Sequence, residues 1–219
     1  MSSFENIKKQ YKTEFDKYGD SPKSILTPKG RNVNRYSVIT DYIDSQKELD
    51  ILDYGCGLGY LYEYLKPKYS NLNYHGYDLM PEFISHCKDK FTDEKANFLV
   101  VQPSKNYDND EFDVVFVSGV FNLKSSESEA DSKHYAFSKI KELYSCSKEL
   151  FICDFPSQYV DFKQPGAQHF DVGEITSFCV NNLSRKFIIR HDKLPYEFTL
   201  IAWKNDDILR PDNIFEYET

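Results

Sequence analysis

Apolar and polar positions alternate along this chain in two rhythms, and each rhythm predicts a different kind of element. Short apolar runs bounded by turn-forming residues predict strands; they cover residues 49–54, 72–78, 97–101, 112–118, 149–154, 185–191 and 196–204. Segments with apolar residues at helical spacing predict helices; they cover residues 5–16, 31–47, 58–66, 81–90, 133–146 and 171–182. Strands alternating with helices favour a mostly parallel sheet with helices on both faces, which is an α/β fold.

The last two predicted strands are joined differently from the others. Only the turn Lys193-Leu194-Pro195 separates them. Because a parallel crossover needs about a dozen residues or more, we expect these two strands to pair antiparallel as a hairpin.

A glycine-rich turn follows the first predicted strand, and it carries the clearest chemical signal. Gly55, Gly57 and Gly59 stand at alternate positions, and Asp53 precedes them. The dinucleotide fingerprint Gly-x-Gly-x-x-Gly is one residue longer. In addition, Asp53 places a negative charge where a pyrophosphate would bind. The turn therefore favours a ligand with an ammonium or sulfonium group.

A second acidic residue, Asp78, ends the second predicted strand. A carboxylate at this position can accept hydrogen bonds from both hydroxyls of a ribose. Together, Asp53 and Asp78 indicate a ligand with a cationic amino-acid end and a nucleoside end.

With this pattern the chain resembles the class I S-adenosylmethionine-dependent methyltransferases over residues 30–204. The resemblance rests on Asp53-x-Gly55-x-Gly57-x-Gly59, on Asp78, and on the later segments 112–117 and 150–154. It implies a seven-stranded Rossmann-like sheet in the order 3-2-1-4-5-7-6, with strand seven antiparallel.

The resemblance also implies the cofactor, S-adenosyl-L-methionine, with S-adenosyl-L-homocysteine as product. Carried over residue by residue, the expected cofactor contacts are Asp53, Gly55, Gly57, Gly59, Asp78, Leu79, Met80, Gln102 and Ser118. Gln102 stands where the family often has an acidic residue near the adenine amino group, so this contact departs from the pattern. Turn geometry alone is the alternative for the glycines, and a helix cap is the alternative for Asp78.

The ends of the chain suggest a division into three parts. The segments 18–22 and 190–198 resemble parts of bacterial methyltransferases encoded with cell-surface sugar pathways. We expect residues 1–30 to form a helical cap or lid, residues 31–204 the methyltransferase domain, and residues 205–219 a C-terminal tail. Tyr11, Phe15 and Tyr18 are candidates for one wall of the pocket.

A hydroxyl acceptor benefits from a general base that titrates near neutrality, which favours histidine. His169, after the fifth strand, is the first candidate, and His134 is the second; a surface or capping role is the alternative for both. The expected acceptor contacts are Tyr18, Asn122, Asp154 and Tyr159.

The resemblance, together with these residues, predicts methyl transfer to an oxygen of a small metabolite or sugar-derived acceptor. Two alternatives remain open at this point. One is N-methylation of a small amine, and the other is a non-catalytic partner subunit with a methyltransferase fold.

The composition of this 219-residue chain argues for a small-molecule acceptor and against a nucleic-acid partner. Its formal net charge is −8, whereas nucleic-acid binders usually carry a basic footprint. The five cysteines and the acidic residues form no recognisable metal-ligand pattern, so we expect no metal.

Residues 1–20 lack the apolar core of a signal peptide, and no apolar run approaches the roughly 20 residues of a membrane helix. We therefore expect a cytoplasmic bacterial enzyme; the sequence does not set its oligomeric state.

Overall fold

The computed structural model describes residues 3–27, 31–104, 107 and 111–204. Its helices are α1 (Ser3–Tyr18), α2 (Arg31–Thr40), α3 (Tyr60–Leu65), α4 (Pro81–Lys90), α5 (Glu129–Ser145) and α6 (Val172–Asn182). Its strands are β1 (Leu49–Tyr54), β2 (Leu72–Asp78), β3 (Ala96–Val100), β4 (Phe112–Val117), β5 (Ser147–Pro156), β6 (Phe187–Leu194) and β7 (Glu197–Trp203). The predicted tail, residues 205–219, lies outside the described residues.

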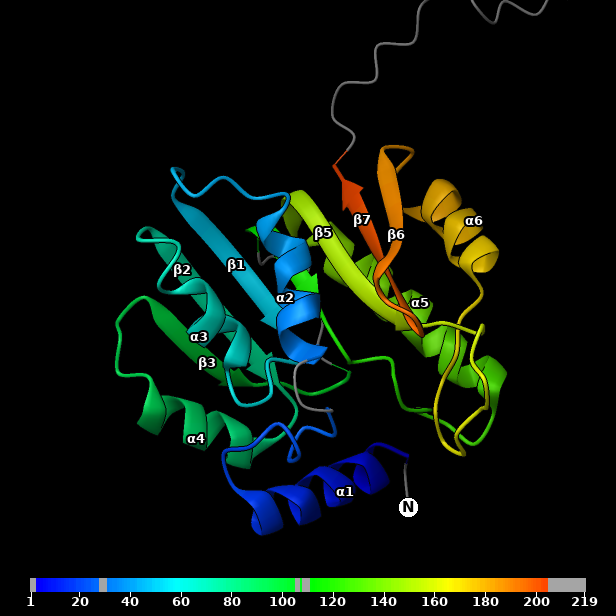
Figure 1. The fold of residues 1–219 in the computed structure, drawn as a ribbon, viewed down its shortest axis with the longest axis horizontal. Coiled ribbons are helices and arrows are strands. Elements are labelled where there is room, and N and C mark those ends of the chain that lie inside the picture. Colours follow the sequence, from blue (N-terminus) through cyan, green and yellow to red (C-terminus); the bar gives the residue numbers. More distant parts are fainter. Residues whose placement is uncertain (1–2, 28–30, 105–106, 108–110, 205–219) are drawn as a thin grey trace, which may run out of the picture.

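The strands form one seven-stranded sheet in the order β3-β2-β1-β4-β5-β7-β6. Strands β1 to β5 pair parallel, and β7 pairs antiparallel with both β5 and β6. The predicted order and the terminal hairpin are thus confirmed. Figure 1 shows α2 and α3 in front of the sheet and α5 behind it, so helices cover both faces.

The core lies on both sides of the sheet because neighbouring strand residues point to opposite faces. Leu52 and Phe151 pack in the cluster that includes α5 and α6. Their neighbours Ile51 and Ile152 pack in the cluster that includes α2, α3 and α4. All four side chains are fully buried, which explains why these strands read as continuous apolar runs.

Helix α2 ends at Thr40, seven residues before the predicted end at residue 47. The chain leaves the helix through the polar stretch 44–47, where the Asp44 side chain accepts a hydrogen bond from the backbone N–H of Gln46 at 2.9 Å. Such side-chain bonds compete with the helical backbone pattern. Tyr42 and Ile43 still pack on the core, and that packing produced the misleading helical periodicity.

The parallel strands end at a common edge of the sheet, and α1 lies across this edge (Figure 1). Ligands of open α/β sheets bind beyond the carboxyl ends of the strands. Within the described part of the chain, no helix is long and apolar enough to cross a membrane.

Candidate active site

The glycine turn after β1 requires backbone angles that other residues avoid. Gly55 has φ 85°, and Gly57 has φ 54°. A Cβ atom on Gly55 would lie 2.3 Å from the Val120 side chain, and one on Gly57 would lie 3.1 Å from Ile25. Both glycines line the cavity described below, so the turn presents bare backbone to it.

Gly59 serves a different purpose. It is the N-cap of α3 in a left-handed conformation, and a Cβ there would lie 2.6 Å from the Phe91 ring. It is not among the described residues that line the cavity. Turn geometry and packing account for this glycine, while its predicted cofactor contact stays a prediction.

Asp78 joins the glycine turn to the start of α4. One carboxylate oxygen accepts a hydrogen bond from Gly57 N–H at 2.8 Å, and the other accepts from Met80 N–H at 2.8 Å. Burial raises the pKa of Asp78 to about 6, although these backbone bonds favour the ionised form. The side chain is thus held in place, negatively charged above this pH, and lines the cavity.

Asp53 lies at the end of β1 and is 4% exposed. The Tyr74 hydroxyl donates a hydrogen bond of 2.5 Å to its carboxylate. Burial raises the pKa of Asp53 to about 7; the Tyr74 bond opposes this shift, and the charges of Asp78 and Asp154 add to it. A cation placed here would stabilise the ionised form, so this corner of the cavity favours a positive group.

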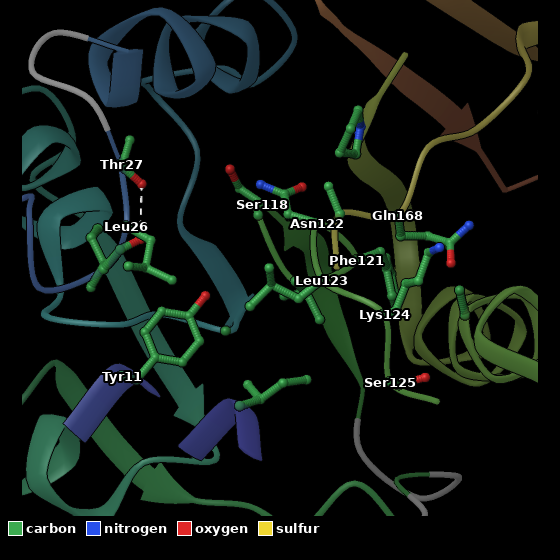
Figure 2. A pocket seen from close by; sticks show the side chains of 18 of the residues that line it. Tyr11, Leu26, Thr27, Ser118, Phe121, Asn122, Leu123, Lys124, Ser125 and Gln168 are labelled. Atoms are coloured by element: carbon green, nitrogen blue, oxygen red, sulfur yellow. Dashed lines mark hydrogen bonds between the residues drawn. The ribbon is translucent and has the colours of Figure 1, made fainter. Parts of the chain in front are cut away.

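These residues line one end of a cavity of about 1110 Å³ at the carboxyl edge of the sheet. Pockets for one drug-sized ligand span roughly 300–1,000 Å³, so this cavity has room for two ligands side by side. Its walls come from separate parts of the chain: residues of α1 and α2, the turn 53–57, the segment 118–127 after β4, and the segments 160–162 and 164–169 after β5. Figure 2 shows Tyr11 and Leu26 on the side opposite Phe121, Leu123 and Lys124.

The other predicted cofactor residues divide into two groups. Leu79 and Ser118 line the cavity. Met80 is buried in the cluster with Leu58 and Phe83, behind the lining. Gln102 is exposed and lies outside the described lining, although its neighbours Val101 and Pro103 belong to it.

Asp154, a predicted acceptor contact, instead organises the turn after β4. Its carboxylate accepts hydrogen bonds from the Ser118 hydroxyl at 2.5 Å and from Gly119 N–H at 2.8 Å. It is 4% exposed, and burial raises its pKa, while the positive charge of Arg35 opposes the shift. Among the described residues, the large cavity is lined by Ser118 and Gly119 rather than by Asp154 itself.

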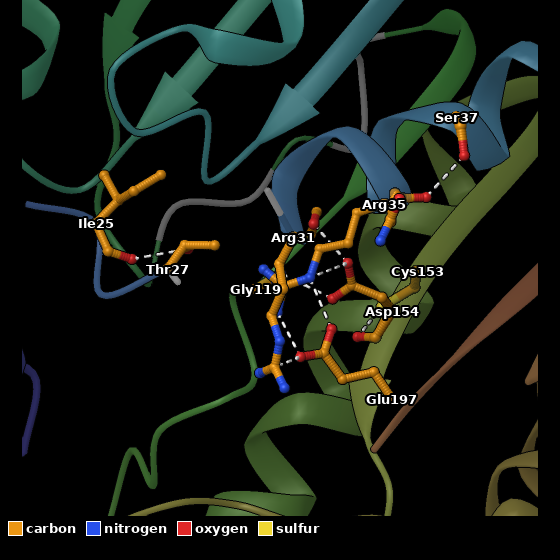
Figure 3. Close-up of polar contacts among 11 residues, drawn as sticks. Ile25, Thr27, Arg31, Arg35, Ser37, Gly119, Cys153, Asp154 and Glu197 are labelled. Atoms are coloured by element: carbon orange, nitrogen blue, oxygen red, sulfur yellow. Dashed lines mark hydrogen bonds and ion pairs between the residues drawn. The ribbon is translucent and has the colours of Figure 1, made fainter. Parts of the chain in front are cut away.

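Arg35 ties α2 to this turn and to β7. Its guanidinium donates two hydrogen bonds to Glu197, at 2.7 and 2.8 Å, and lies 3.7 Å from Asp154. Arg31 adds a second guanidinium 3.6 Å from Glu197 (Figure 3). Arg35 and Glu197 are 162 positions apart, so no local sequence signal indicates this pair.

The predicted bases lie in different surroundings. His169 lines the cavity, and its pKa is lowered by burial and by the positive charge of Lys163. A lowered pKa keeps the imidazole neutral near pH 7, which is the form that accepts a proton. His134 is exposed on α5 and is not part of the described lining.

The remaining acceptor candidates differ in whether they line the cavity. Asn122 lines the cavity, and its buried Oδ1 has no hydrogen-bond partner among the described residues. Tyr159 is 64% exposed and lies outside the described lining, as does Tyr18 at the end of α1. Tyr11 is the wall candidate that lines the cavity, whereas Phe15 packs on Phe83.

In the part of the chain that the structure describes, no group of three or more His, Cys, Asp or Glu side chains could hold a metal ion. The described lining of the site offers a glycine turn, the carboxylates of Asp53 and Asp78, His169 and the unpaired amide oxygen of Asn122.

Residues 52–143 match the family model described as a methyltransferase domain. Malonyl-[acyl-carrier protein] O-methyltransferase of Acetivibrio thermocellus is 26% identical over 156 residues, which are 63% of this chain and 52% of that protein. The chain thus spans about half the length of this relative. A putative methyltransferase of Mycobacterium tuberculosis is 23% identical over 165 residues, covering 74% of this chain and 97% of that protein.

Solved structures share the fold across most of the chain. Magnesium protoporphyrin IX methyltransferase from Synechocystis PCC 6803, crystallised with bound SAH, has a TM-score of 0.67 at 15% identity and covers 92% of this chain and 100% of that chain. An S-adenosylmethionine-dependent methyltransferase from Clostridium acetobutylicum has a TM-score of 0.58 at 17% identity and covers 90% of this chain and 98% of that chain. At such identities the likeness establishes the fold alone.

Proposed function

Because this chain belongs to the class I S-adenosylmethionine-dependent methyltransferases, we propose that it transfers a methyl group from S-adenosylmethionine to an oxygen of a small-molecule acceptor. One observation carries the proposal. Asp53 and Asp78 flank a bare glycine turn at one end of a cavity of about 1110 Å³, which leaves space for an acceptor beside the cofactor.

The residues of this chain fit the cofactor. Gly55 and Gly57 let its methionine part lie against the backbone, and a Cβ at these positions would press on Val120 and Ile25 in the cavity wall. Asp53 suits the ammonium group, and Asp78 has oxygen lone pairs left for ribose hydroxyls. Leu79 offers an apolar surface for the adenine. S-adenosylmethionine, when bound, supplies a methyl group on a positively charged sulfur and needs no further activation.

The remaining task of the protein is to align the acceptor and keep water out. His169, held neutral, accepts the proton of an acceptor hydroxyl. The unpaired Oδ1 of Asn122 accepts a hydrogen bond from the acceptor, and Asp154 fixes the Ser118–Gly119 backbone beside it. We leave His134, Tyr18 and Tyr159 out of this proposal because they lie outside the cavity lining among the described residues.

The finer parts of the assignment are proposals as well. A sugar-derived or other small metabolite is the proposed acceptor, with no nucleic acid, and the proposed location is the cytoplasm. Residues 1–30 are proposed to act as a cap, residues 31–204 as the catalytic domain and residues 205–219 as a tail. The acceptor of the Acetivibrio thermocellus relative is not carried over to this chain, because the match covers only 52% of that protein.

Titration calorimetry with S-adenosylhomocysteine tests the cofactor part of the proposal. We expect the wild-type protein to bind and Asp78→Ala to weaken binding at least about tenfold, since a carboxylate bonded to ribose hydroxyls is lost. Asp89→Ala is the matched control because Asp89 is an exposed acid on α4. Absence of binding by the wild type would refute the proposal.

Transfer of isotope-labelled methyl groups to candidate acceptors tests the reaction. Fragmentation of the product by mass spectrometry separates O-methylation from N-methylation. For an oxygen acceptor, we expect His169→Asn to lower kcat at least about a hundredfold while binding of S-adenosylhomocysteine is retained.

A further inference from the structure

Helix α1 forms a roof over the carboxyl edge of the sheet (Figure 1). Phe4, Ile7 and Tyr11 recur at helical spacing and line the cavity. The Phe4 ring lies 5.0 Å from the Tyr135 ring, on α5. Farther along α1, the Tyr11 ring lies 5.9 Å from the Phe83 ring, on α4. The roof therefore spans the cavity from α5 to α4.

The Tyr11 hydroxyl is the polar group that this row of apolar side chains presents to the cavity. Figure 2 shows it pointing into the cavity, away from the α1 backbone. Among the described residues, no group forms a hydrogen bond with it. It is close enough to Asp78 and Arg35 for both charges to act on it.

The Tyr11 hydroxyl is a donor at any physiological pH. Burial raises its pKa to about 12, and the negative charge of Asp78 adds to the shift. The proton therefore stays on the oxygen and is available to a ligand atom that accepts hydrogen bonds.

Ring packing alone does not explain a tyrosine at this position. Phe15, one turn later on α1, packs edge-on against the same Phe83 ring at 5.3 Å without a hydroxyl. The hydroxyl lines the cavity and is therefore placed to bond a ligand, and a ligand partner is the physical reason for keeping it.

We propose that Tyr11 is a cofactor-binding residue whose hydroxyl donates a hydrogen bond to an oxygen of S-adenosylmethionine beside Asp78. Asp78 accepts from the ribose hydroxyls, whereas Tyr11 supplies a donor that Asp78 cannot provide. Binding then fastens α1 over the site, which closes the cavity to water. This inference rests on the proposed function.

The test compares three forms of the full chain by titration calorimetry with S-adenosylhomocysteine. Tyr11→Phe removes only the oxygen and keeps the ring on Phe83, so its unfolding midpoint without ligand should equal that of the wild type. We expect its affinity to fall roughly fivefold to tenfold. Tyr18→Phe, on the same helix but outside the described lining, should bind like the wild type.

A second ligand, 5′-methylthioadenosine, identifies the oxygen. It keeps the ribose but lacks the amino-acid part. A Tyr11→Phe penalty that persists with this ligand places the bond on the ribose; a penalty seen only with S-adenosylhomocysteine places it on the carboxylate.

Hydrogen exchange of the α1 backbone amides measures whether ligand binding holds this helix over the site. S-adenosylhomocysteine should slow exchange in residues 3–18 of the wild type and slow it less in Tyr11→Phe. If Tyr11→Phe binds both ligands within twofold of the wild type, Tyr11 is not a cofactor residue, even though the cofactor site stands. If the wild type binds neither ligand, the proposed function itself is wrong.

Discussion

At the scale of single residues, the glycine turn is held by two separate constraints. One is the positive φ of Gly55, which any side chain makes costly. The other is contact with Val120, whose side chain occupies the space of a Cβ. Gly19 shares the first constraint, with φ 57°, but nothing lies within 4 Å of its Cβ position. The two positions therefore separate strain from contact.

We expect Gly19→Ala to lower the free energy of unfolding by about 1–2 kcal/mol, the cost of a left-handed alanine. Gly55→Ala should lower it by about 2–5 kcal/mol because overpacking against Val120 adds to the strain. Urea denaturation of both variants measures the difference. Equal losses of unfolding free energy in the two variants would mean that Val120 moves aside freely and that the glycine turn tolerates a methyl group at Gly55.

At the scale of elements, Arg35 connects α2 to the ends of β5 and β7. Its side chain is 9% exposed, and those of Glu197 and Asp154 are 11% and 5% exposed. Two carboxylates are thus buried around one guanidinium, with Arg31 at the margin. Removing a single partner from such a group leaves an uncompensated charge in the interior.

Arg35→Met should therefore lower the free energy of unfolding by about 3–5 kcal/mol. The double variant Arg35→Met/Glu197→Gln should recover part of that loss because one of the stranded charges is gone. Arg190→Met is a comparison on the surface, where the ion pairs with Asp41 and Asp192 are more exposed, and should cost about 1 kcal/mol or less. A similar loss for both arginines would contradict this view of the Arg35 group.

At the scale of the whole molecule, the carboxyl edge of the sheet concentrates negative charge that folding buries. Burial raises the pKa of Asp53 to about 7 and that of Asp78 to about 6, and it also raises the pKa of Asp154. In the unfolded chain these groups ionise near pH 4. Their protonated forms favour the folded state, so their contribution to stability is complete below pH 4 and is lost as the pH rises through 6 to 7.

The ligand-free protein should consequently have a higher unfolding midpoint at pH 5 than at pH 8. His169, whose pKa is lowered, opposes this trend inside the window, but it is one group against three buried carboxylates. Asp93, whose backbone and Lys66 bonds lower its pKa to about 2, acts below the window. Asp53→Asn should reduce the difference between the two pH values. Calorimetric unfolding at both pH values measures the two midpoints. A midpoint that is higher at pH 8 than at pH 5 would exclude a stabilising role for the protonated carboxyl groups.

Most of the scaffold is predictable from the sequence because its signals are local. Continuous apolar runs cover most of β1, β4 and β5, and this local pattern is enough to predict a buried strand at each. The end of α2 is not predictable in the same way. Tyr42 and Ile43 continue the apolar periodicity although the backbone has already turned, since core packing does not require a helix.

The candidate site is more predictable on its cofactor side than on its acceptor side. Gly55, Gly57 and Asp78 each stand at or just after the end of a predicted strand, and the structure places all three on the cavity. On the acceptor side the loops decide. His169 and His134 are the same residue type, and both follow a predicted strand. In the structure His169 lines the cavity, whereas His134 lies on the surface.

The sequence by itself determined the strand and helix order, the glycine turn and the two acidic residues that end β1 and β2 beside it. These depend on hydrophobic period and on residues close together in the chain. Only the tertiary structure decided that Tyr11, among the three wall candidates, lines the cavity, that Arg35 meets Glu197, and that Asp154 holds the turn after β4. Such contacts join distant segments, and they exist only once the sheet order and the loops have brought those segments together.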